Sequence, residues 1–125
     1  MRIVNRLPGL PVERALRVIS GRWKAVILHA LLDGPHRTFE LQRRIMGISQ
    51  KVLIDQLRAL EEHGMVRRQA SLEDIQGVEY LLTPLGESLR PVLLSLIEWG
   101  AHHAEQLHEA DRLLPCHAVV GDPPA

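Results

Sequence analysis

Residues 37–82, RTFELQRRIMGISQKVLIDQLRALEEHGMVRRQASLEDIQGVEYLL, decide the fold of this chain. A short polar helix is expected over residues 38–45, followed by a tight turn at residues 46–48. A longer helix is expected over residues 49–63, where leucines recur at spacings of four and three and therefore share one face. That face is predicted to pack on the core, and the charged opposite face is predicted to lie in solvent.

Two strand-like segments follow the second helix. Residues 65–70 and 78–82 are predicted to pair, and residues 72–77 form the polar link of a hairpin. Two helices that meet at a tight turn and are followed by a hairpin are the layout of a winged helix-turn-helix, whose second helix enters the major groove of DNA. We therefore predict a mainly α-helical fold with a small β-hairpin wing.

Further helices are expected on both sides of this segment. A helix over residues 11–19 begins with a proline, which suits a first turn because that turn does not use the missing N–H. The nearly all-apolar residues 22–32 predict a central buried helix. A long helix is predicted from residue 83 to about residue 107, with a kink or a second start at Pro91.

Positive charge is concentrated in the first half of the chain. The formal net charge is 0, but residues 1–68 carry 13 Lys and Arg against 6 Asp and Glu, whereas residues 69–125 carry 2 against 9. Such asymmetry indicates a nucleic-acid-binding surface paired with an acidic face elsewhere. The alternative is that these charges only solvate unrelated surfaces.

The last helix carries more apolar side chains than one small domain can easily cover. Together with the apolar first helix, this predicts that the two chain ends pack across the two-fold axis of a homodimer. The alternative is that the same side chains complete the core of a monomer. The expected interface residues are Val12, Leu16, Leu89, Leu93, Leu96 and Trp99.

Length and composition fit one domain. With 125 residues, of which 46% are hydrophobic and 24% charged, the chain can bury one moderate core. We assign residues 1–110 to a winged helix-turn-helix domain for DNA binding and dimerisation, and residues 111–125 to a poorly ordered tail.

The single Cys116 in that tail is expected to be a free thiol rather than a redox sensor. The sequence has no run of 18 apolar residues and no secretory signal. We therefore expect a cytoplasmic protein without a membrane partner.

Short motifs spread between residues 11 and 100 carry a resemblance to a known family. In chain order they are Pro11–Leu16, Gly21–Lys24, Leu31–Pro35, Phe39, Gly47–Lys51, Leu57–Arg58 with Leu60–Glu61, Gly64–Val66, Val78–Tyr80, Leu82–Thr83 with Leu85–Gly86, and Trp99–Gly100. Taken together, they closely resemble the HxlR-type winged helix-turn-helix regulators of bacteria. The resemblance implies a homodimer that binds an inverted repeat near a promoter and dimerises through its first and last helices.

Two positions depart from the pattern of that family. Many members carry a redox-reactive cysteine directly before the Pro-Val-Glu motif, where this chain has Leu10, so thiol sensing at that site is chemically excluded. Many members also place a basic residue before Val-Glu-Tyr, where this chain has Gly77 after an acidic tip at Glu73 and Asp74. Phosphate repels an acidic tip, which argues against a wing contact with DNA there.

The start of the second helix is expected to reach the edges of DNA bases. Gln50 can pair with adenine, and Lys51 can donate to guanine or to a phosphate. Ser49 is the predicted N-cap, and a phosphate could share that helix end. Asp55 either accepts from a cytosine amine or orients Lys51 one turn earlier, and the orienting role is slightly favoured.

The remaining predicted DNA contacts surround that helix start. Long cations placed there can meet phosphates, although solvated charges and intramolecular ion pairs are the alternative for each. These contacts are Arg37, Thr38, Arg43, Arg44, Arg58, Arg67 and Arg68.

Two other functional classes compete with DNA binding. An enzyme is not expected, because the sequence has no glycine-rich phosphate loop, no Gly-x-Ser-x-Gly elbow and no paired carboxylates in an evident pocket. No cofactor or metal is expected either, because His102, His103 and His108 lack the spacing of two ligands on one helical face.

A winged-helix protein-interaction module without DNA binding remains the alternative. A small apolar effector between the long helix and the core is a further candidate partner, beside double-stranded DNA and a second copy.

Overall fold

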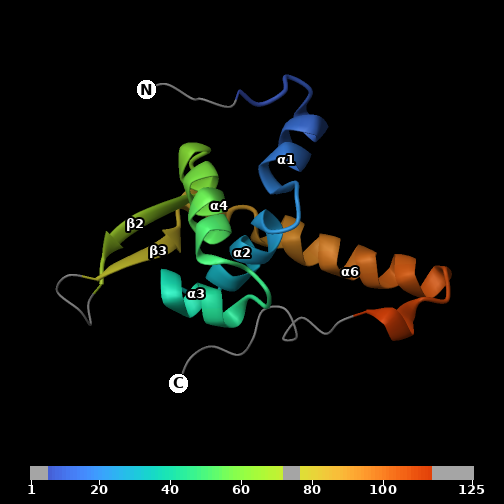
Figure 1. Cartoon of the computed structure of the whole chain (residues 1–125). Coiled ribbons are helices and arrows are strands. Elements are labelled where there is room, and N and C mark those ends of the chain that lie inside the picture. The colour runs from blue at the N-terminus through green and yellow to red at the C-terminus, as the bar shows by residue number, and fades with distance from the viewer. Residues whose placement is uncertain (1–5, 72–76, 114–125) are drawn as a thin grey trace.

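The chain is mainly α-helical with one small antiparallel sheet. The computed structural model describes residues 6–71 and 77–113. Its elements are α1 (Pro11–Ile19), α2 (Lys24–Leu31), β1 (His36–Arg37), α3 (Thr38–Arg44), α4 (Gln50–Glu62), β2 (Val66–Ala70), β3 (Val78–Leu82), α5 (Pro84–Glu87), α6 (Arg90–Gln106) and the 3₁₀ helix η1 (Ala110–Arg112). Figure 1 shows the β2–β3 hairpin projecting from one side of the body and α6 from the other. The predicted helical fold with a hairpin wing is confirmed.

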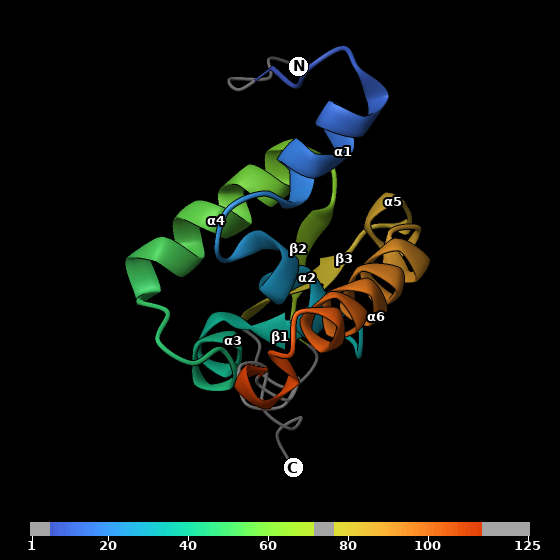
Figure 2. The same ribbon diagram turned by 90° about the vertical axis from the view of Figure 1, so that its right-hand side faces the viewer.

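The core forms around α2. Ile27, Leu28, Ala30 and Leu31 are at most 2% exposed, so the prediction of a central buried helix is confirmed. The other large side chains that are fully buried are Leu41, Ile45, Leu53, Leu57, Leu60 and Val66. Three of these are the leucines of α4, which confirms that its leucine face belongs to the core. Figure 2 shows α2 between α4 on one side and α6 on the other.

The sheet contains a strand that the sequence pattern did not predict. The strand β1 pairs antiparallel with β3, His36 opposite Tyr80 and Arg37 opposite Glu79, so that the strand order is β1-β3-β2. A strand of two residues is too short to show any alternation of apolar and polar side chains. Because β1 pairs with β3 and runs directly into α3, the same short strand connects the base of the wing to the helix-turn-helix.

The C-terminal helix is interrupted before Pro91. Thr83 caps α5, since its Oγ1 accepts from the Gly86 N–H at 3.0 Å and donates to the Gly64 carbonyl oxygen at 2.5 Å. The helix α6 then begins at Arg90, with the proline in its first turn. Of the two alternatives for Pro91, the structure therefore has the second helix start.

Some of the predictions made from the sequence fall at or beyond the edges of the described chain. The expected tail boundary at residue 111 lies inside η1, where Arg112 pairs with Glu109 at 2.9 Å. Cys116 and the Glu73–Asp74 tip lie outside the described residues. Within residues 6–71 and 77–113, every helix is too short or too polar to cross a bilayer.

Gly86→Ala is expected to destabilise the fold strongly. A Cβ on Gly86 would lie 2.1 Å from the Met65 carbonyl oxygen, a backbone atom that cannot rotate away. Overpacking of this kind costs about 3 kcal/mol of the free energy of unfolding. Urea denaturation measures the loss, with Gly9→Ala as the control because nothing lies within 4 Å of its added methyl group. Equal unfolding midpoints for the two variants would contradict the close approach.

Candidate nucleic-acid interface

The turn between α3 and α4 fixes the direction in which α4 leaves the body. Gly47 has φ +85°, in the left-handed region that favours glycine. The next residue, Ile48, is 5% exposed and packs into the core. Because one side of the turn is anchored in this way, the first turn of α4 starts from a defined position.

The first turn of α4 is capped and faces outward. Ser49 has extended backbone, and its hydroxyl accepts from the Val52 N–H at 3.2 Å. This is the N-cap geometry that the sequence predicted. Gln50 and Lys51 follow directly and are both exposed. The outward position expected for these two side chains is confirmed.

Lys51 and Asp55 form an ion pair across one helical turn. The Lys51 Nζ donates to the Asp55 Oδ2 at 3.0 Å, and the two side chains are 85% and 51% exposed. A pair this exposed contributes little to stability. It does hold the lysine along the outer face of α4, which supports the orienting role for Asp55 over direct contact with a base.

Four of the arginines predicted to contact phosphate are exposed. They are Arg43 on α3, Arg58 on α4, and Arg67 and Arg68 on β2. The Arg68 Nε donates to the Glu61 Oε2 at 3.1 Å, so a phosphate would have to compete with that carboxylate. The side chains of Arg43, Arg58 and Arg67 make no ion pair with any other residue in the described ranges 6–71 and 77–113.

Arg37 and Thr38 lie at the start of α3 and are half-buried. The Arg37 N–H donates to the Glu40 Oε1 at 2.8 Å, which is one half of a capping box. The Arg37 guanidinium lies 5.1 Å from the centre of the Phe39 ring. These contacts order the start of α3, and they leave the two side chains less accessible than the first turn of α4.

The predicted outward position of Arg44 is wrong. This side chain is 8% exposed, and its Nη1 donates to the Ala30 carbonyl oxygen at 3.3 Å and to the Asp33 Oδ1 at 3.2 Å. Arg44 lies three residues after the buried Leu41 and one before the buried Ile45, so helical spacing places it on the inner face of α3. That spacing was the signal that the sequence interpretation missed. A phosphate cannot reach the guanidinium there.

The side chains predicted for a dimer interface divide into two groups. Val12 and Leu16 on α1 are 67% and 55% exposed, and Leu96 and Trp99 on α6 are 43% and 62% exposed. Leu93 is 4% exposed and belongs to the core, and the half-buried Leu89 packs against it. For these last two, completion of the monomer core was the better interpretation.

Two histidines lie on α6, His102 and His103, and His108 follows the end of that helix. The His103 ring stacks on Trp99, with ring centroids 5.1 Å apart, and His102 and His108 are exposed. Over the described parts of the chain, no group of three or more His, Cys, Asp or Glu could hold a metal ion.

The helix-turn-helix and its wing match a known family. A model of the HxlR-like helix-turn-helix family matches residues 18–108. This chain belongs to that family. A similar protein is YkvN of Bacillus subtilis, named an HTH-type transcriptional regulator, which is 49% identical over 94 residues that cover 75% of this chain and 80% of YkvN. YtfH of Escherichia coli, named likewise, is 40% identical over 89 residues, or 71% of each chain.

Solved structures of other regulators share this architecture. The reduced form of the redox regulator HypR matches with a TM-score of 0.71 and 38% identity, over 78% of this chain and 97% of HypR. The reduced form of the transcriptional regulator YodB from B. subtilis matches with a TM-score of 0.71 and 34% identity, over 80% of this chain and 98% of YodB. The resemblance inferred from the sequence motifs is therefore confirmed.

Lys51→Ala is expected to weaken binding to operator DNA. Loss of a base contact costs about 1 to 3 kcal/mol of discrimination between the correct and a wrong base pair. Loss of a phosphate contact instead lowers the slope of log affinity against log salt concentration by about 1. Gel-shift titrations on a duplex selected from genomic fragments measure both quantities. Arg112→Ala is the matched control, because Arg112 also pairs with a carboxylate one turn away, at 2.9 Å, but lies in η1. An affinity unchanged by Lys51→Ala would remove this lysine from the interface.

Proposed function

We propose that this chain is a transcriptional regulator that binds DNA sequence-specifically, as a homodimer on an inverted repeat. The observation that carries the proposal is the division of α4 into two faces. Its leucines are wholly buried, while Gln50 and Lys51 are exposed beside the Ser49 cap. A recognition helix needs this arrangement, because it must stay fixed to the body while its first turn enters the major groove.

The exposed cations support the same function. Arg43, Arg58 and Arg67 come from α3, α4 and β2, and both α3 and β2 pack against α4. Phosphate contacts from such positions fix the register of a protein on the duplex without reading its sequence. The names of the relatives, HTH-type transcriptional regulators, agree with this role.

Apolar faces that one copy leaves exposed support the homodimer. The helix α1 has no buried residue at all, although Val12 and Leu16 share one of its faces. On α6, the exposed apolar side chains include Leu96 and Trp99. Large apolar side chains that gather on the exposed face of a helix are typical of an interaction site.

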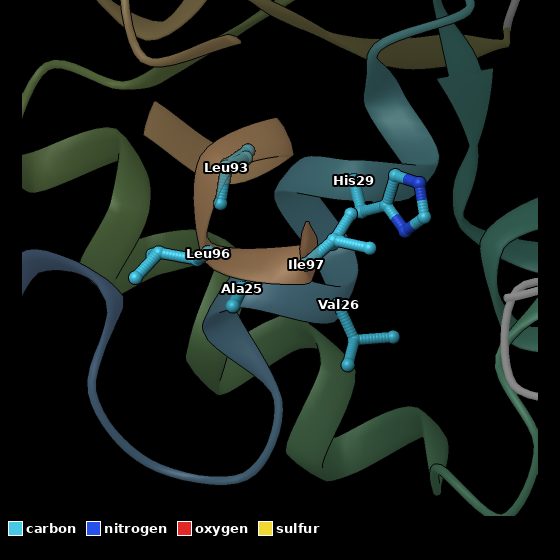
Figure 3. Close-up of a pocket in the computed structure, with 6 residues that line it drawn as sticks. All are labelled: Ala25, Val26, His29, Leu93, Leu96 and Ile97. Atoms are coloured by element: carbon cyan, nitrogen blue, oxygen red, sulfur yellow. The ribbon is translucent and has the colours of Figure 1, made fainter. Parts of the chain in front are cut away.

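A groove between α2 and α6 continues that apolar surface. Its volume is about 230 Å³, and Figure 3 shows the side chains that line it. They are Ala25, Val26, His29, Leu93, Leu96 and Ile97. We assign the groove to the dimer seam. The small apolar effector expected between the long helix and the core would occupy the same groove. Binding of such an effector stays a prediction.

Charge favours packing of α1 from one copy against α6 of the other. Arg14 and Arg17 are exposed on α1, and Glu98 and Glu105 are exposed on α6. Opposite charges that flank two apolar faces give the complementarity that selects a partner and a register. A two-fold axis would make this contact twice.

Salt dependence separates the proposed function from a winged-helix interaction module. A dimer that meets several phosphates through each copy should lose roughly 10³-fold or more in affinity for duplex DNA between about 50 and 200 mM salt. Fluorescence anisotropy with a labelled duplex measures this slope. Absence of binding to any duplex at low salt would overturn the proposal in favour of the interaction module.

Trp99→Glu is expected to produce monomers, because the seam would then bury an unpaired carboxylate. Trp99→Leu is the matched control, since it keeps an apolar side chain at the same position and should leave the protein dimeric. Sedimentation velocity distinguishes the two states. If the Glu variant sediments as an intact dimer, α6 is not the seam.

A further inference from the structure

Two arginines from different helices donate to the end of the central helix α2. A helix leaves its last carbonyl oxygens without partners of its own. The Arg44 Nη1, from α3, donates to the Ala30 carbonyl oxygen at 3.3 Å, and the Arg90 Nη2, from α6, donates to the Leu32 carbonyl oxygen at 2.8 Å. The end of α2 therefore connects α3, which leads into the proposed recognition helix, with α6, which carries the proposed dimer seam.

Arg90 is the first residue of α6 and is bonded on two sides. Its Nε donates to the Glu87 Oε1 at 2.7 Å, and its Nη2 contacts the same carboxylate. The bond to the Leu32 carbonyl is partly buried and joins residues 58 positions apart, whereas the arginine side chain as a whole is 42% exposed. A cation at the C-terminal end of a helix also interacts favourably with the helix dipole. Arg90 is therefore a long-range link and not only a surface ion pair.

This link lies where α6 is otherwise weakly fixed in direction. Pro91 has no N–H, so it cannot continue the backbone hydrogen bonds of α5 into α6. Leu93 is 4% exposed and belongs to the core, but Ile97, one turn further along, is 38% exposed. A helix that is seated mainly through one core side chain can tilt about that side chain. The bond from Arg90 to Leu32, about one turn before Leu93, opposes such a tilt.

We propose that Arg90 is a positioning residue that sets the direction of α6, and thereby the spacing between the two DNA-binding surfaces of the homodimer. This inference rests on the proposed homodimer. A helix of 17 residues is about 25 Å long, so a tilt of about 5° at its base moves its far end by about 2 Å. Two copies together give about 4 Å, which exceeds the rise of roughly 3.4 Å for one base pair. Arg90 should therefore decide how strictly the protein measures the distance between two half-sites.

The test compares wild type with Arg90→Ala on operators with one base pair inserted or removed between the half-sites. Half-site spacing is a geometric requirement for a dimer on DNA. For wild type we expect a loss of about tenfold in affinity, comparable to one mismatched base pair, and for Arg90→Ala a loss at least about threefold smaller. The penalty for a base substitution within a half-site should be the same in both proteins, because α4 is unchanged. A variant that is merely less stable would instead lose affinity for all these operators by one common factor.

Arg112→Ala is the matched control. Arg112 also pairs with a glutamate three residues earlier, Glu109, at 2.9 Å, but it lies in η1 beyond the far end of α6. Its replacement removes the same charge and the same kind of ion pair. The spacing preference of wild type should therefore be retained. Relaxation of that preference to the same extent in Arg112→Ala and Arg90→Ala would assign the effect to charge and overturn the inference.

Pulsed electron paramagnetic resonance on the DNA-free dimer gives a second readout. A spin label at Arg58→Cys, in a Cys116→Ser background, reports the distance between the exposed faces of α4 in the two copies. Arg90→Ala should broaden or shift this distance distribution by about 4 Å, the movement that the helix length allows. An unchanged distribution, or equal spacing penalties in wild type and Arg90→Ala, would overturn the inference. A wild-type protein that is monomeric, or that binds no duplex, would instead overturn the proposed function.

Discussion

The packing of α4 on α2 is the contact on which the rest of the structure depends. Leu53, Leu57 and Leu60 are fully buried, as are Ile27 and Leu28 of the central helix. Removal of these apolar side chains from water fixes the rotation of α4 about its own axis. That rotation decides which residues face outward, so the stability of the core and the identity of the residues proposed to contact DNA are set by the same interaction.

The parts of the fold that the sequence predicted are those in which local and long-range preferences agree. The helix α4 has a serine cap, a periodic leucine face and a glycine after its end, and the structure places it within one residue of the prediction. The strand β1 had no such signal, because its existence depends on β3, more than 40 residues later in the chain. Pairing partners at that separation leave no mark on a two-residue segment.

The candidate interface was predicted well where exposure follows from helical geometry and poorly where it follows from tertiary contacts. Lys51 lies opposite the leucines, so its outward position could be deduced. Arg44 was assigned to the surface. Its spacing from Leu41 and Ile45 favours the inner face of α3, but an arginine is rarely buried without partners. Its burial is stabilised by acceptors from Ala30 and Asp33, which the fold brings to it from α2. Leu93 was placed at a dimer seam for a similar reason, because the packing of α6 on the core was not evident from its pattern.

The pairing of β1 with β3 has a mechanical consequence. One end of α3 and the base of the hairpin are fastened to the same strand, so neither can swing without carrying the other along. In the proposed homodimer, a signal that arrived through α6 would therefore move the hairpin and α3 of each copy together. Such a movement would change the spacing between the two DNA-binding surfaces rather than the shape of either one.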